Sequence, residues 1–223
     1  MSATAGNRIA TAEGDVADTI HYPCPACGSP LYGWVAAHDP LRSGRKVVID
    51  RCESCRLAVT RAAEPPDVEA ELDAVIERGD DGAVELTAPN GASVQGSLGG
   101  GQWAGLEPEL RRLHLSPDST RRLLAQQGIE VTGVSTPYTP ATNALMRQTL
   151  INAFTLRDNF LRNARAGRLP TPGSTRERLL QWLDYAVSWL VWLPCALVAY
   201  PLERGAAKLG RGGALRVTGI GAD

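Results

Sequence analysis

The pattern of apolar and polar positions predicts strands first and then helices that alternate with strands. Strands are expected where apolar and polar residues alternate or form short apolar runs, at 31–36, 46–50, 57–60, 83–88, 129–135 and 214–220. Helices are expected where apolar residues recur every three or four positions, at 68–78, 117–128, 141–165 and 175–209. A glycine-rich loop is expected between residues 91 and 105. The alternation from residue 67 onward is typical of an α/β sheet.

This pattern predicts two structured parts within the 223 residues. We expect a flexible N-terminus at 1–19, a strand-rich module at 20–61, a linker at 62–66 and an α/β region at 67–223. The α/β region has only three expected strands, too few for a stable doubly wound sheet. Its sheet should therefore have an open edge, which we place at Ala83–Ala88 and expect a protein partner or a second copy to cover.

Two Cys-x-x-Cys pairs lie in the N-terminal module, Cys24 with Cys27 and Cys52 with Cys55, with 24 residues between the pairs. Four thiolates on two such turns can surround one zinc ion, the zinc-ribbon arrangement. A redox pair would explain either turn alone but not two turns in strand-rich sequence. Four thiolates leave no open coordination position, so the predicted zinc is structural. Gly28 follows the first pair, whereas Arg56 stands at the matching place, so the second turn is expected to be either strained or closed differently.

Composition and charge narrow the class of protein. With 43% hydrophobic and 21% charged residues the chain can bury a core, which excludes wholesale disorder. The net charge of −1 does not favour nucleic-acid binding, although zinc ribbons often contact nucleic acid. The first residues do not contain the apolar segment that is typical of a secretory signal. Cys195 stands alone in an apolar run, which indicates a buried, unreactive thiol. We expect a cytoplasmic protein, with a peripheral position at the inner face of the membrane as an option.

That option comes from the C-terminal apolar helix. Residues 185–202 contain no charged side chain, and Trp182, Tyr185, Trp189 and Trp192 fall on one helical stripe with basic residues on both flanks. An interfacial or re-entrant helix, a helix packed on the sheet or a partner, and a transmembrane span all remain open. Pro194 and Pro201 disfavour one straight span.

Several motifs occur in an order that resembles a known family. They are Cys24-Pro-Ala-Cys-Gly28, Arg51-Cys-Glu-Ser-Cys-Arg-Leu57, Gly79-Asp-Asp-Gly-Ala-Val-Glu-Leu-Thr-Ala-Pro-Asn90, Gln102-Trp-Ala-Gly-Leu-Glu-Pro108 and His114-Leu-Ser-Pro-Asp-Ser119. Together they resemble bacterial class I S-adenosylmethionine-dependent methyltransferases that begin with a zinc ribbon and act on lipid-linked or large glycan substrates. The resemblance implies a truncated methyltransferase-like, Rossmann-like sheet behind the ribbon. His114 is then the one candidate for a remnant base or substrate contact, although a hydrogen bond near the helix cap at Ser116 is the preferred interpretation.

The family's cofactor-binding half has no counterpart between Pro66 and Val68. The glycines at 96–101 lie downstream of the expected position and indicate a loop, so S-adenosylmethionine is not expected to bind the isolated chain. The resemblance therefore implies a non-catalytic scaffold, a regulatory pseudoenzyme or a partner subunit in glycan or glycolipid modification. The alternatives are a methyltransferase completed by another chain and a membrane-surface zinc-ribbon adaptor.

Overall fold

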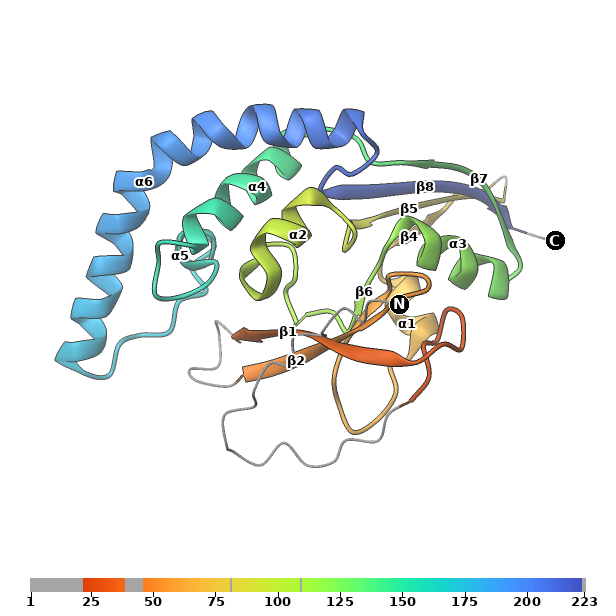
Figure 1. Ribbon diagram of the computed structural model, residues 1–223, viewed down its shortest axis with the longest axis horizontal. Helices are drawn as coiled ribbons and strands as arrows, with labels where there is room; N and C mark the ends of the chain where they lie inside the picture. Colours follow the sequence, from red (N-terminus) through yellow and green to blue (C-terminus); the bar gives the residue numbers. More distant parts are fainter. Residues whose placement is uncertain (1–21, 39–45, 81, 109, 222–223) are drawn as a thin grey trace, which may run out of the picture.

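The chain forms two antiparallel four-stranded sheets and a long C-terminal helix (Figure 1). The computed structural model describes residues 22–38, 46–80, 82–108 and 110–221. The segment 1–19, expected to be flexible, therefore lies outside the described residues.

The first sheet carries the strands expected for the ribbon. Its order is β1 (Leu31–His38), β2 (Lys46–Cys52), β3 (Ala58–Thr60) and β6 (Leu113–His114), and each neighbouring pair is antiparallel. The fourth strand, β6, comes from far along the chain and pairs with β3. The ribbon sheet is thus completed by the region that the sequence assigned to the α/β part.

The second sheet has the order β4 (Ile76–Arg78), β5 (Ala83–Pro89), β8 (Ala214–Gly221) and β7 (Ile129–Ser135). All its neighbouring strands are antiparallel, whereas a doubly wound sheet is built from parallel neighbours, so the Rossmann-like topology is not confirmed. Buried and more exposed residues alternate along β5 and β8, as expected of an antiparallel sheet with one face on the core.

The expected open edge at Ala83–Ala88 is wrong. β5 pairs with β8 on one side and with β4 on the other, where Ile76 lies opposite Leu86. The sequence assigned Ile76–Arg78 to the end of a helix, but α1 (Val68–Asp73) stops earlier and the chain returns as β4. Within the described residues, β4 and β7 form the edges of this sheet.

The other helices differ from expectation in two places. The described helices after α1 are α2 (Val94–Gly99), the 3-10 turn η1 (Gly100–Gln102), α3 (Pro117–Gln126), α4 (Pro140–Asn152), α5 (Phe160–Arg165) and α6 (Thr175–Lys208). The expected glycine-rich loop contains α2, and the expected helix 141–165 is divided into α4 and α5. Asn159 precedes α5 with a φ of 55°, a left-handed conformation that interrupts a continuous helix.

One hydrophobic core joins the two sheets. It contains Cys52 and Leu57 of the ribbon together with Leu86, Leu123 and Leu215, which come from β5, α3 and β8. The sequence boundaries at 20–61 and 67–223 stay a prediction, but the packing joins the two parts into one hydrophobic unit.

Helix α6 lies over α4, α5 and α2 and is bent part-way along its length (Figure 1). Pro194 and Pro201 lie inside it, and each proline removes a helical hydrogen bond and crowds the preceding turn. The two prolines therefore explain the bend.

A close approach of η1 to β1 gives the first testable prediction. A Cβ on Gly101 would collide with the carbonyl oxygen of Ala36, so Gly101→Ala should lower the free energy of unfolding by about 2 kcal/mol or more. Gly205→Ala is the control, because Gly205 lies in α6 and a Cβ added there would meet no atom within 4 Å, so this change should raise stability by up to about 1 kcal/mol. Urea unfolding of both variants measures the difference, and equal midpoints would contradict the described packing.

Candidate metal centre

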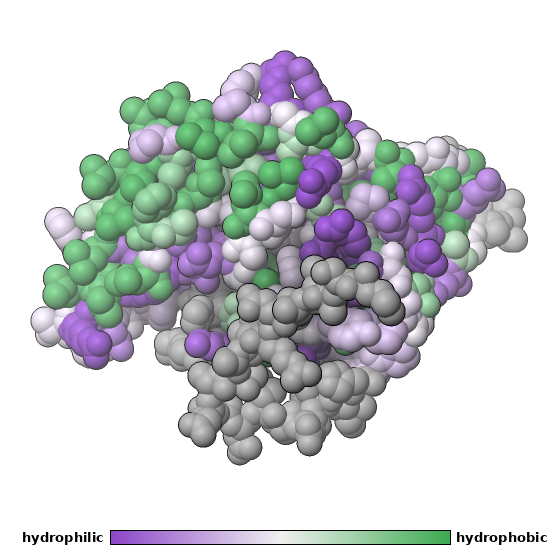
Figure 2. All heavy atoms as spheres, in the orientation of Figure 1, coloured by the Kyte–Doolittle hydropathy of each residue, from purple (hydrophilic) through white to green (hydrophobic). Residues whose placement is uncertain are grey.

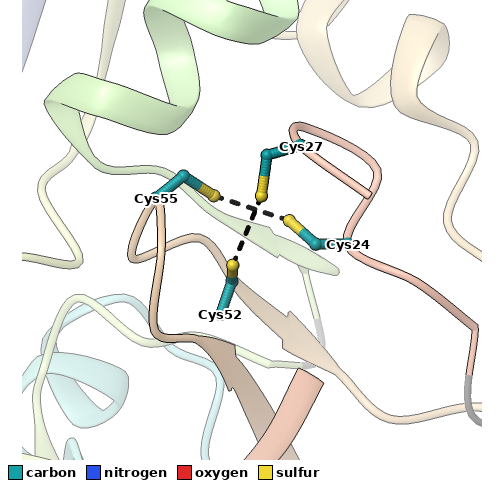
Figure 3. A group of neighbouring side chains, drawn as sticks. All are labelled: Cys24, Cys27, Cys52 and Cys55. Atoms are coloured by element: carbon teal, nitrogen blue, oxygen red, sulfur yellow. Dashed lines mark hydrogen bonds between the residues drawn. The ribbon is translucent and has the colours of Figure 1, made fainter. Parts of the chain in front are cut away.

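Four cysteine side chains converge between the two turns of the ribbon (Figure 3). Cys24 and Cys27 lie in the turn before β1, Cys52 ends β2, and Cys55 lies in the turn before β3. All four sulfur atoms lie within 4.8 Å of one another, and the Cys24–Cys55 and Cys27–Cys52 Sγ–Sγ distances are both 3.5 Å. A tetrahedral zinc ion with Zn–S bonds of about 2.3 Å requires sulfur atoms about 3.8 Å apart. The cluster is therefore positioned to bind one metal ion.

The backbone closes the two cysteine turns in the same way. The amide of Gly28 donates to the carbonyl of Cys24 at 2.8 Å, and that of Arg56 donates to Cys52 at 3.0 Å. Both residues adopt a left-handed conformation, with φ of 71° at Gly28 and 61° at Arg56. The sequence predicted strain at Arg56, and a side chain in this region costs about 1 kcal/mol.

The thiols of the metal-free cluster differ in acidity. Burial raises the pKa of Cys24 to about 11 and also raises the pKa of Cys55. Burial acts in the same direction on Cys27, but hydrogen bonds from the Ser29 side chain and backbone outweigh it and lower that pKa to about 6. Cys27 is thus ionised more readily than Cys24 or Cys55.

The donor set fits a structural zinc ion. Cys24, Cys52 and Cys55 are buried, and four thiolates complete a tetrahedral shell without a position for water or substrate. Among the described residues, these cysteines are the one group of three or more histidine, cysteine or acidic side chains placed closely enough to hold a metal ion.

Helix α3 ties both cysteine turns to the second sheet. The hydroxyl of Ser116, its N-cap residue, donates to the carbonyl of Cys55 at 2.6 Å, and Gln126 in its last turn donates to the carbonyl of Pro25 at 3.3 Å. The cap at Ser116 and the proline at the first helical position are confirmed. Their attachment to the metal site was not predicted, because a cap motif indicates a helix start and not its tertiary partner.

The His114 side chain is buried, and it also lines a cavity together with Trp103 and Arg111. Its Nε2 is 3.0 Å from the hydroxyl of Thr60 on the neighbouring strand β3, and not in the Ser116 cap where the sequence placed its hydrogen bond. Burial, followed by the charge of Arg111, lowers its pKa to about 3, so the imidazole is neutral at physiological pH. This arrangement joins β6 to β3.

Comparisons with protein-family models, curated proteins and solved structures found no match. The methyltransferase resemblance therefore stays an expectation from the motifs of the sequence. A function for this chain has to be inferred from its own geometry.

Loss of one thiolate should affect the whole fold. We expect Cys52→Ser to abolish stoichiometric metal binding and to destabilise both sheets, because Cys52 lies in the core that they share. Zinc bound by four thiolates contributes on the order of 10 kcal/mol to folding in small modules. Metal analysis and hydrogen exchange measure the effect. Cys195→Ala is the control, since this thiol lies on α6 outside the cluster; a folded Cys52→Ser variant with full metal content would contradict the assignment.

Zinc affinity should rise with pH. The raised pKa values of Cys24 and Cys55 keep both thiols protonated in the metal-free protein near neutral pH, so binding must displace their protons. Release of at least these two protons corresponds to an affinity gain of about a hundredfold or more per pH unit. Competition with a chromogenic chelator between about pH 6 and 8 checks this, and a pH-independent affinity would contradict it.

Proposed function

We propose that this chain is a zinc-organised, methyltransferase-like scaffold that acts through its surfaces rather than through a catalytic centre of its own. The observation that carries the proposal is the strand β4 beside β5. In the resembled family the sheet would continue from this strand into the cofactor-binding half. Here the chain's own β4 pairs with β5 through Ile76, Glu77 and Arg78 and occupies that position.

The glycine-rich segment also supports a scaffold. A cofactor loop needs glycines whose backbone is open to a ligand. A Cβ on Gly99 would instead lie 2.6 Å from a methyl group of Thr149, and one on Gly101 would meet Ala36 of β1. These glycines permit close packing of η1 between β1 and α4.

The alternative function is enzymatic: a methyltransferase whose cofactor-binding half is supplied by another chain. Since β5 is paired on both sides, a partner would have to add its strands at β4 or β7.

A role as a membrane-surface zinc-ribbon adaptor is a second candidate, favoured by α6. Of the described helices, this one is long and apolar enough to cross a membrane, and only 17% of its most apolar window is buried.

Cofactor binding tests the scaffold proposal. We expect no heat of binding when S-adenosylmethionine is titrated into the zinc-loaded full chain, because a methyl donor needs a preorganised pocket that holds both reactants. Full metal content and a cooperative thermal transition verify that the sample is folded. Saturable binding with one site per chain would overturn the proposal and restore an enzyme.

A further inference from the structure

Helix α6 packs Val191 and Trp192 against Ile151 and Leu161, but it exposes far more apolar surface than a helix on the surface of a water-soluble domain. Its buried residues are mostly small or polar, and they are Asp184, Ser188, Cys195, Ala199, Glu203 and Ala206. Its outer face is apolar, with Trp182 70%, Trp189 61% and Leu190 79% exposed. A surface helix in water normally turns its apolar stripe toward the core, so this outer face requires another environment.

Two buried carboxylates hold the helix in this orientation. Near its start, Asp184 accepts a hydrogen bond from the amide of Leu156 at 2.7 Å and lies 3.4 Å from Nε of Arg157. Near its end, Glu203 accepts from the side chain of Gln95 at 2.6 Å and from the amide of Gly213 at 2.8 Å. Rotating α6 to bury its apolar face would break the hydrogen bonds of both Asp184 and Glu203. Two carboxylates would then lack their partners, at a high cost in free energy.

The apolar face extends beyond α6. The segment between α4 and α5 exposes Phe154 and Leu156, and Leu156 is bonded to Asp184 of α6. Figure 2 shows the hydrophobic side chains gathered along the α6 side of the molecule. Exposed apolar patches of this extent mark interaction or membrane surfaces.

Positive charge is concentrated in the same part of the chain. Residues 147–211 contain ten arginine and lysine side chains and four acidic ones, a net charge of +6, while the rest of the chain carries −7. Three of the four acids, Asp158, Asp184 and Glu203, are buried. This segment therefore presents almost only positive charge to its surroundings.

The arginines lie beside the aromatic side chains of α6. Arg165 is 5.9 Å from the ring centre of Trp189, and Arg147 is 4.8 Å from that of Trp192. Arg204 donates to the hydroxyl of Tyr200 at 2.7 Å. Aromatic rings with neighbouring arginines suit the boundary between lipid tails and anionic headgroups.

We propose that α6 and the segment 153–159 form a docking surface for an anionic lipid bilayer. The part of α6 before Pro194 lies in the plane of the interface and inserts Trp182, Trp189 and Leu190. A second copy of this chain fits this surface less well, because two segments 147–211, each with a net charge of +6, would then face and repel each other. A span fits less well too, because Asp184 and Glu203 fasten the two ends of α6 to the same body. This docking does not depend on the scaffold role.

Vesicle flotation of the full zinc-loaded chain tests the proposal. We expect co-flotation with vesicles of phosphatidylcholine and phosphatidylglycerol, a blue shift of tryptophan emission, and much weaker binding to phosphatidylcholine alone. Leu190→Glu should reduce binding at least tenfold. Leu110→Glu, at a similarly exposed leucine outside α6, should leave binding unchanged. The double variant Arg176→Gln/Arg178→Gln should lose about fivefold per arginine on the anionic vesicles.

Unchanged metal content and thermal transition verify that each variant is folded. Absence of binding to anionic vesicles, or equal loss in Leu190→Glu and Leu110→Glu, would overturn the proposal. A stable dimer that Leu190→Glu converts to a monomer would assign the surface to a second copy instead. Resistance of bound protein to alkaline carbonate extraction would replace the in-plane helix with a span.

Discussion

The four-cysteine cluster is the constraint on which the rest of the structure depends. The sulfurs converge from two turns that the chain connects through the hairpin of β1 and β2, and α3 attaches to the carbonyls of both turns through Ser116 and Gln126. A metal ion bound by the four sulfurs would hold the two turns of the ribbon together and, through α3 and the shared core, would also hold the second sheet. The cysteine cluster is therefore connected to more of the chain than the segment that supplies its four sulfurs.

A second set of polar contacts decides what the molecule presents to its surroundings. The hydrogen bonds of buried Asp184 and Glu203 fix the rotation of α6 and thereby hold its exposed apolar residues outward. The cost of exposing indole and leucine side chains to water is then offset only when another phase or surface covers them. Fold stability and the proposed membrane docking are linked in this helix.

Several features expected of a methyltransferase-like chain have structural roles here. β4 pairs with β5 at the edge that the sequence predicted to be open, Gly99 and Gly101 permit tight packing, and His114 joins two strands as a neutral imidazole. The motifs of the sequence thus coexist with a geometry that suits a scaffold, which is the basis of the proposed function.

The sequence by itself determined the local features: the four cysteines of the candidate metal centre from their spacing, the cap at Ser116, and the strands β1, β2, β3, β5, β7 and β8 from their patterns. It did not determine strand neighbours, because a strand pattern carries no information on its partner or direction. Tertiary structure alone decided three features. Ile76–Arg78 extends as the strand β4, β6 joins the sheet of the ribbon, and the large apolar side chains of α6 point away from the core. The physical reason is that a short segment takes the conformation in which its backbone N–H and C=O groups find hydrogen-bond partners, and these partners come from distant parts of the chain. The rotation of α6 likewise depends on the buried hydrogen-bond partners of Asp184 and Glu203.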